Sequence, residues 1–135
     1  MKHRGYLLDT NILSAMLKNP QGSVAEKIRQ VGHQCIFTSI IVASELQFGI
    51  RKKASASLTE RVERVLESIN IIDFKSPADR HYGEIRSLLQ QAGTPIGPND
   101  LLIAAHALAE NLIMVTDNSN EFQRVPRLKV ENWLL

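Results

Sequence analysis

Four acidic residues lie far apart in the chain, but each stands beside the end of an apolar run or the start of a helical pattern. Asp9 and Asp117 directly follow apolar runs, and Glu45 and Asp100 lie close to the starts of two helices. If the fold brings the four carboxylates together, their mutual repulsion is large, and a divalent cation relieves it. A cation held in this way polarises a phosphate group and helps to ionise an attacking water molecule. The four residues therefore predict metal-dependent cleavage of phosphodiester bonds.

The expected metal ion is a hard divalent cation such as Mg²⁺, which prefers oxygen ligands at about 2.0–2.1 Å and keeps several bound waters. Two of the carboxylates could therefore bind it directly and two through water. Because a metal-bound water needs no histidine as a base, we expect the histidines of the chain to be surface or structural residues. They are His3, His33, His81 and His106.

Each acidic residue also has a purely structural interpretation. Asp9 could cap a short helix that begins at Ile12, and Asp100 could complement the dipole of the helix that it opens. Asp117 could belong to an ordinary turn. Glu45 is harder to explain in this way, because it lies in an apolar stretch of a helix where a small or apolar residue would pack better. We favour the functional interpretation because all four positions fall at one predicted edge of one sheet.

Apolar runs and helical patterns alternate along the chain. The runs predict strands at residues 6–8, 35–38, 71–74, 113–116 and 129–131. The helical patterns cover residues 12–18, 23–31, 39–53, 58–69, 78–92 and 101–112, with a short final helix near residue 121. This alternation predicts an α/β fold of Rossmann-like type, with a mostly parallel five-stranded sheet and helices on both faces. Ligands of such sheets bind at the carboxyl ends of the strands, near the point where the strand order reverses.

The composition is that of an ordinary globular protein. The 135 residues suit one domain spanning residues 1–135, and the hydrophobic content is 44%. The apolar stretches are too short to cross a bilayer, and no signal peptide is recognisable, so we expect no membrane association. The lone Cys35 cannot form an internal disulfide, which is typical of the cytoplasm, and we expect it to be a small buried residue.

The charge balance is mildly basic, with a net charge of +2. This excess alone does not indicate nucleic-acid binding. It gains weight if the acidic residues gather in one cleft, because the remaining surface is then more basic. The densest basic cluster after the N-terminus is Arg51-Lys52-Lys53. These residues either complement a helix C-terminus or contact RNA phosphates, and the sequence leaves both interpretations open.

Four short motifs resemble those of a known family. They are Leu7-Leu8-Asp9-Thr10-Asn11, the Ser39…Glu45-Leu46…Gly49 segment, Pro95-Ile96-Gly97-Pro98-Asn99-Asp100, and Thr116-Asp117-Asn118…Glu121-Phe122. In this order and at this spacing, the chain resembles PIN-domain ribonucleases and, among them, the VapC toxins of VapBC toxin–antitoxin pairs. The resemblance extends over the whole chain, including the terminal segment that ends near Trp133.

The resemblance implies a Mg²⁺- or Mn²⁺-dependent endoribonuclease that acts as a homodimer. It implies a VapB-like antitoxin that covers the active site, and contacts to operator DNA only through the antitoxin complex. The Pro-Ile-Gly-Pro-Asn-Asp stretch is similar to that of members that cut initiator tRNA in its anticodon loop.

The resemblance also assigns roles to the acidic residues. Asp9 and Asp100 match the direct metal ligands, and Glu45 completes the cluster. The fourth acid is either Asp117 or Glu121, and we favour Asp117 because it directly ends a strand. The resemblance further implies that a set of neighbouring residues orients the carboxylates or the bound water. This set comprises Thr10, Asn11, Ser39, Thr116 and Glu121.

Two other functions deserve comparison with this one. Asp9 followed by Thr10 and Asn11 is loosely similar to the aspartate nucleophile of phosphatase-like hydrolases, but those enzymes usually carry a second acid where this chain has Asn11. The other alternative is a non-catalytic module that binds proteins. It predicts that Asp9→Asn leaves RNA integrity unaffected.

Overall fold

The computed structural model describes residues 2–134, which form a five-stranded sheet covered by helices. The strands stand in the order β3-β2-β1-β4-β5, and every pairing between them is parallel. Their bounds are β1 Gly5–Leu8, β2 Ile36–Ser39, β3 Asn70–Ile72, β4 Leu112–Val115 and β5 Val130–Glu131. The chain thus builds outward from β1 to one edge, then returns to the other side of β1 with β4. The predicted α/β fold with a parallel sheet is confirmed.

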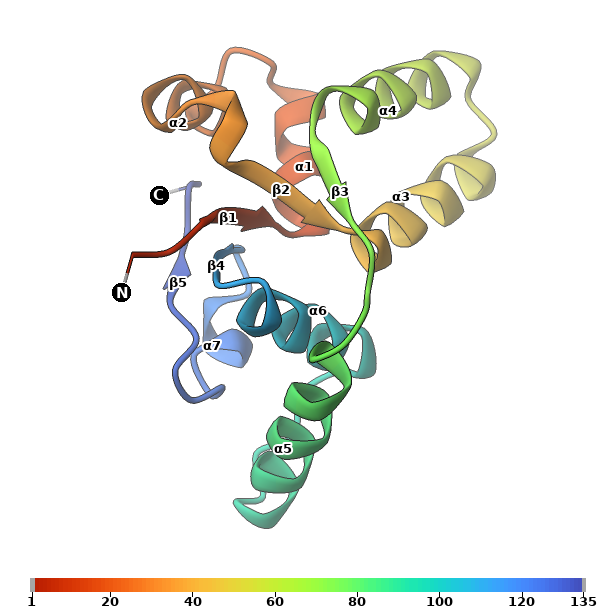
Figure 1. Ribbon diagram of the computed structural model, residues 1–135. Coiled ribbons are helices and arrows are strands. Elements are labelled where there is room, and N and C mark those ends of the chain that lie inside the picture. The colour runs from red at the N-terminus through yellow and green to blue at the C-terminus, as the bar shows by residue number, and fades with distance from the viewer. Residues whose placement is uncertain (1, 135) are drawn as a thin grey trace.

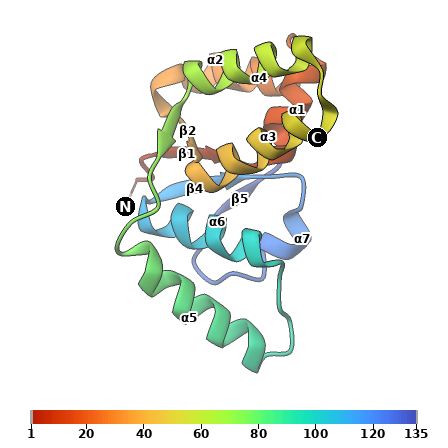
Figure 2. The same cartoon turned by 90° about the vertical axis from the view of Figure 1, so that its right-hand side faces the viewer.

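The helices lie in two groups on the two sides of the sheet (Figures 1 and 2). The upper group in both views is α1 Thr10–Lys18, α2 Ser23–Val31, α3 Ile40–Lys53 and α4 Ala56–Ser68. The lower group is α5 Ala78–Gln91, α6 Pro98–Ala109 and α7 Ser119–Phe122. A short 3-10 turn at His33–Cys35 leads from α2 into β2. Among residues 2–134, no helix combines the length and the apolar character that a membrane span requires.

The core is centred on β1, β4 and α6. The two strands are almost wholly buried, as a central strand with helices on both faces should be. Helix α6 is apolar on nearly all sides and contacts α5, β4 and α3, which explains why its alanines are buried. Gly5 belongs to this close packing, because a Cβ atom there would lie 2.4 Å from the carbonyl oxygen of Cys35.

The boundaries of several elements differ from the prediction. The helix predicted at residues 101–112 begins three residues earlier, because Pro98 fits the first turn, where its missing N–H is not needed. It ends at Ala109, and Asn111 adopts a left-handed conformation with φ 56° that turns the chain into β4. The third strand covers residues 70–72 instead of 71–74. The second strand covers residues 36–39 instead of 35–38, because Cys35 closes the 3-10 turn and Ser39 stays in the strand.

Cys35 also departs from the prediction in its burial. It is half-buried and not fully enclosed, because it lies at the end of the 3-10 turn, before the buried part of β2 begins. Within residues 2–134 it is a free cysteine, as the count in the sequence requires.

Candidate active site

The acidic residues gather at the carboxyl edge of the sheet, where the strand order reverses. Leu8 and Val115 are paired neighbours at the ends of β1 and β4. Asp9 follows directly, and its backbone N–H donates to the carbonyl of Val115 at 2.9 Å. Asp117 leaves β4 at the same edge, two residues beyond Val115. The predicted proximity of the two strand ends is therefore present in the structure.

Asp9 is the most enclosed of the acids, with 5% of its surface exposed. One carboxylate oxygen accepts the backbone N–H of Thr10 at 2.8 Å and thereby caps α1. The other oxygen accepts the hydroxyl of Thr116 at 2.9 Å. Burial raises the pKa of Asp9, and the charges of Glu45 and Asp117 raise it further, against the two hydrogen bonds. The capping role and the site role therefore belong to the same side chain.

Glu45 reaches the same edge from the second turn of α3. Its Oε1 accepts the hydroxyl of Thr10 at 2.6 Å, and its Oε2 accepts the amide of Asn99 at 3.3 Å. Thr10 thus bonds Asp9 through its backbone and Glu45 through its side chain. This arrangement gives Glu45, which no packing argument explained, a fixed position between α1 and the start of α6.

Asp100 is the third residue of α6 and forms a carboxyl–carboxylate pair with Glu121 of α7. Burial raises the pKa of Asp100 to about 7, and the hydrogen bond with Glu121 and the charges of Asp9, Glu121 and Glu45 add to the rise. The pKa of Glu121 is lowered, chiefly because its carboxylate accepts that hydrogen bond from Asp100. Asp100 therefore binds a proton more readily than Glu121 does.

Asn118 bridges this pair to the end of β4. Its amide donates to Glu121 Oε2 at 2.9 Å and to Asp100 Oδ2 at 3.4 Å, and its backbone N–H donates to the hydroxyl of Thr116 at 3.0 Å. Sequence reasoning assigned no role to Asn118 or Asn99. The available signal was their position, because each stands directly beside a candidate acid and an amide can donate to a carboxylate.

Asp117 is placed differently from the other acids. It is exposed, and its Oδ1 accepts the amide of Asn11 at 3.0 Å. Its charge nevertheless acts on Asp9. Asn11 is thus a partner of Asp117. A phosphatase-like site would need a second acid at this position, two residues after Asp9, and the chain has none there.

The sequence predicts that Ser39 orients the carboxylates or the bound water, but its hydrogen bonds go to other groups. Its hydroxyl oxygen accepts the backbone N–H of Ile41 at 3.0 Å and lies 2.7 Å from Nδ1 of His106, and none of its hydrogen bonds within residues 2–134 reaches a carboxylate. The reason is that Ser39 caps α3 and faces the buried side of α6. His106 is fully buried, and its Nε2 lies 3.0 Å from the carbonyl of Asp73. His106 is a structural histidine, as predicted.

The donor set suits a hard divalent cation, because the clustered ligands are carboxylates and amides without cysteine or histidine. The fit is supported by the raised pKa of Asp100, since excess negative charge retains a proton where a cation could stand. Within the described chain, however, no three acidic, histidine or cysteine side chains already converge on one point that could hold a metal ion. The oxygens are instead bonded to Thr10, Thr116, Asn99 and Asn118.

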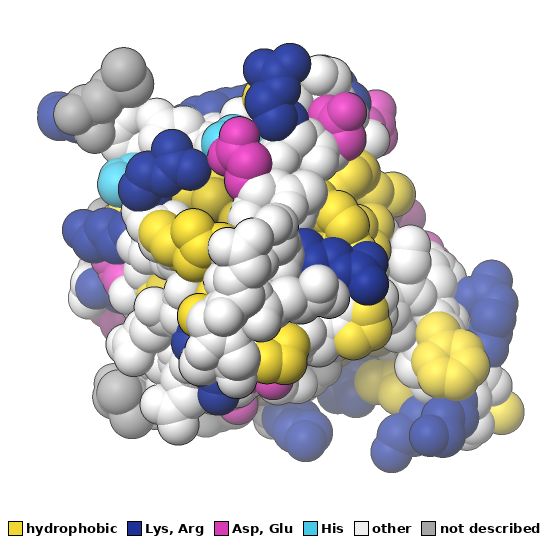
Figure 3. Space-filling view, turned by 90° about the horizontal axis from the view of Figure 1, so that it is seen from below, with side chains coloured by type: hydrophobic (Ala, Val, Ile, Leu, Met, Phe, Trp, Pro, Cys, Tyr) yellow, Lys and Arg dark blue, Asp and Glu magenta, His cyan; other side chains and the backbone are white. Residues whose placement is uncertain are grey.

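The basic cluster predicted to contact RNA lies in the last turn of α3, and all three residues are exposed. Arg51 donates to both the side chain and the carbonyl of Gln47, at 2.7 and 3.0 Å, so part of the cluster serves the helix itself. Figure 3 shows Lys and Arg side chains spread over the lower face, with hydrophobic and acidic side chains between them. An RNA contact by Arg51, Lys52 and Lys53 stays a prediction.

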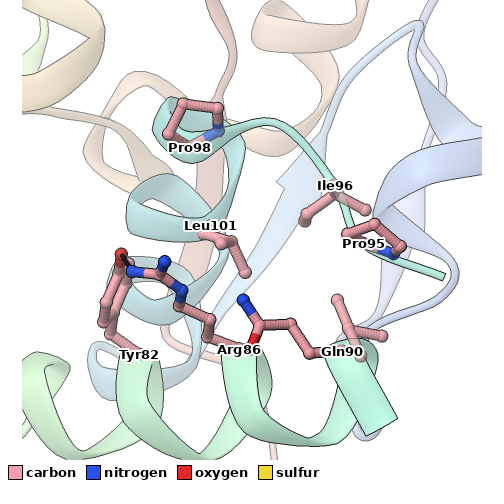
Figure 4. Close-up of a pocket in the computed structure, with 8 residues that line it drawn as sticks. Tyr82, Arg86, Gln90, Pro95, Ile96, Pro98 and Leu101 are labelled. Atoms are coloured by element: carbon pink, nitrogen blue, oxygen red, sulfur yellow. Dashed lines mark hydrogen bonds between the residues drawn. The ribbon is translucent and has the colours of Figure 1, made fainter. Parts of the chain in front are cut away.

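A second hollow lies between α5 and the loop that leads into α6 (Figure 4). No acidic residue lines this pocket of about 190 Å³, and the Arg86 guanidinium donates to the Tyr82 hydroxyl at 3.0 Å. Pro95, Ile96 and Pro98 form its other wall. The pocket therefore borders the segment that carries Asp100 but is lined by no carboxylate that could hold a metal ion.

Comparisons with known proteins agree with this architecture. Residues 6–128 match the PIN domain family. Ribonuclease VapC2 of Rickettsia felis is 42% identical over 130 residues, which cover 95% of this chain and 97% of the relative. The tRNA(fMet)-specific endonuclease VapC of Shigella flexneri is 38% identical over 133 residues, with 95% and 97% covered. The crystal structure of VapBC2 from Rickettsia felis, bound to a promoter DNA fragment, superposes with a TM-score of 0.86 at 39% identity, covering 95% of this chain and 98% of that chain. The chain therefore belongs to the PIN-domain family and, within it, to the VapC ribonucleases.

Proposed function

We propose that the protein is the toxin of a type II toxin–antitoxin pair and acts as an endoribonuclease that depends on Mg²⁺ or Mn²⁺. One observation carries this proposal: Asp9 lies at the sheet edge where β1 and β4 end, close enough to Glu45 of α3, Asp100 of α6 and Glu121 of α7 for their charges to act on one another. A fold has no structural need for such an accumulation of like charge, and removing it from water is costly.

In this proposal Asp9 and Asp100 hold the metal ion directly, and Glu45 completes the cluster. Bound there, the ion would polarise the scissile phosphate and lower the pKa of the attacking water. Thr10 and Thr116 hold the Asp9 and Glu45 carboxylates in place through the hydrogen bonds described above. Such supporting donors typically contribute about 10–100-fold in metal affinity or activity.

Glu121 suits the role of the fourth acid better than Asp117 does. Sequence reasoning favoured Asp117, but Glu121 is the acid bonded to Asp100, whereas Asp117 is exposed and bonded to Asn11. We propose that Glu121 completes the metal site and that Asp117 contributes long-range charge.

The substrate and partners follow from the relatives. One relative is a tRNA(fMet)-specific endonuclease, and a similar structure is a VapBC complex on promoter DNA. We propose that this chain cuts an unpaired loop of structured RNA, with initiator tRNA as the first candidate, and works in the cytoplasm. We also propose that it forms a homodimer, that a VapB-like antitoxin neutralises it, and that it reaches operator DNA only through the antitoxin complex.

The test is cleavage of purified initiator tRNA by the chain freed of antitoxin. We expect cutting with Mg²⁺, loss of cutting in EDTA, and recovery when Mg²⁺ or Mn²⁺ is added back. Asp9→Asn should reduce the rate by more than about 100-fold, because a direct ligand matters more than its supporting donors. Glu121→Gln should be more damaging than Asp117→Asn.

Circular dichroism and thermal melting provide the control that each variant is folded. Full cleavage by Asp9→Asn, or cleavage that persists in EDTA, would contradict the proposed metal site. A folded wild-type chain that binds RNA without cutting it would instead favour the non-catalytic alternative.

A further inference from the structure

Phe48 is the most exposed of the large hydrophobic side chains in residues 2–134, with 68% of its surface accessible. Its location gives this exposure a meaning that a lone surface phenylalanine would lack. Phe48 lies three residues after Glu45 on α3, so the two side chains are neighbours on one face of the helix. An exposed aromatic ring therefore stands one helical turn from the acidic cluster.

The ring borders an open hollow of about 560 Å³. Ile41, Leu102 and Phe48 form its apolar part. Its polar part contains Ser44 and the hydrogen-bonded pair of Asn99 and Glu45, whose amide nitrogen and carboxylate oxygen are 3.3 Å apart. The hollow is thus continuous with the acidic cluster, because Glu45 belongs to both.

We propose that this hollow binds one unpaired base of the RNA substrate, stacked on Phe48, next to the phosphate that is cleaved. The proposal rests on the proposed ribonuclease function and adds a base subsite to it. Aromatic side chains stack on the splayed-out bases of RNA loops. Ile41 and Leu102 supply apolar surface that the stacked base can contact. Asn99 and Ser44 supply polar groups that can bond a base edge.

An RNA base fits the hollow better than an apolar protein surface does. An apolar protein surface covering it would take the Glu45 carboxylate out of water, which is costly unless that protein supplies a cation. A base would leave that carboxylate free to take part in the metal site proposed above. Arg51 lies one further turn along α3 and is exposed, so a cation is available for a neighbouring phosphate on the far side of the ring.

The base subsite is tested by measuring RNA binding separately from RNA cleavage. In the Asp9→Asn background, a fluorescein-labelled RNA hairpin with a seven-nucleotide loop and a fully paired duplex of the same stem are titrated by anisotropy with Mg²⁺ present. We expect Phe48→Ala to weaken hairpin binding about tenfold, within the range of base–aromatic stacking, and to leave duplex binding unchanged. Phe48→Tyr should restore hairpin binding, because it keeps the aromatic face.

Leu88→Ala is the matched control, because Leu88 is an exposed apolar residue (49%) on α5 and does not line the hollow. Unchanged hairpin binding in Phe48→Ala, or an equal loss in Phe48→Tyr, would overturn the base subsite. So would a fall in molar mass of Phe48→Ala by light scattering, which would identify a second copy of the chain as the occupant. If the wild type fails to cut RNA while Phe48 still governs hairpin binding, the ribonuclease function fails and the base subsite stands.

Discussion

Single small residues hold the charges of the site in place. Thr10 binds Asp9 through its backbone N–H and Glu45 through its hydroxyl, and Asn118 binds both Asp100 and Glu121. Each of these donors offsets part of the cost of a partly buried carboxylate, because a charged acceptor gains more from a hydrogen bond than a neutral one does. The remaining cost is visible in the raised pKa values of Asp9 and Asp100.

At this scale we predict that Asp100→Asn stabilises the metal-free protein at neutral and alkaline pH. The pKa of Asp100 is about 7 in the folded chain and about 3.8 when unfolded, so its ionisation penalises folding increasingly as the pH rises from 3.8 through 7. At pH 8 in EDTA the variant should melt a few degrees above the wild type, a modest gain because solvent screens this half-exposed group. Melting curves from pH 4 to pH 8 provide the check. The two proteins should coincide near pH 4, and a gap that persists there would contradict the explanation.

The elements of the site are tied together by a buried hydrogen-bond chain. His106 of α6 contacts Ser39, which caps α3, and the carbonyl of Asp73 in the loop after β3. Because that carbonyl can only accept, Nε2 carries the hydrogen, and Nδ1 accepts the hydroxyl of Ser39. Burial lowers the pKa of His106 and keeps it neutral. The helix that carries Asp100 is thereby fixed to the start of the helix that carries Glu45.

We predict that His106 makes the fold sensitive to acid. Its folded pKa lies below the unfolded value of 6.5, so its contribution to stability is complete above pH 6.5 and is lost as the pH falls below that value. In the Asp100→Asn background, which removes the opposing titration, stability should decrease below pH 6.5. Adding His106→Gln should flatten this decrease and cost about 1–3 kcal/mol at pH 7.5, because a buried partner loses its hydrogen bond.

Urea unfolding at several pH values measures both effects. If stability decreases equally below pH 6.5 in proteins with and without His106, another group is responsible for the decrease.

The elements were largely predictable from the sequence, and the reasons differ from place to place. Alternating apolar runs and amphipathic patterns predicted the parallel sheet, and the strand ends predicted the meeting of Asp9 with the end of β4. The contacts of Ser39 and Glu121 could not be predicted, because they depend on how helices rotate about their axes. Local patterns do not encode that rotation. Helix ends were missed where proline or a left-handed Asn111 decided them.

Across the whole molecule, charge is divided unevenly. The acidic residues of the site lie at one edge of the sheet, while Lys and Arg side chains are spread over the lower face among scattered Asp and Glu side chains (Figure 3). A net charge of +2 therefore understates the positive character of the surface outside the site. Short groups of cations can bind RNA phosphates. The densest such group after the N-terminus lies at the exposed end of α3 and consists of Arg51, Lys52 and Lys53.

We predict that this group contributes a measurable salt dependence to RNA binding. If Arg51, Lys52 and Lys53 each neutralise one phosphate of a single strand, the slope of log affinity against log salt includes about −2 from them. Replacing all three by glutamine should reduce the steepness by about that amount. Anisotropy titrations of Asp9→Asn between 50 and 200 mM salt would measure it, with the exposed Arg64 and Lys75 replaced as a control pair. An unaltered slope would assign these cations to the helix C-terminus alone.

The hydroxyl of Thr116 reaches Asp9 across 107 positions of sequence. During synthesis, the first acid therefore leaves the ribosome long before the strand that secures it. A nascent or prematurely released chain that stops short of β4 contains Asp9, Glu45 and Asp100 but lacks Thr116 and Glu121. Such a fragment carries no assembled centre. The cluster can therefore assemble only after β4 and the residues that follow it have been synthesised.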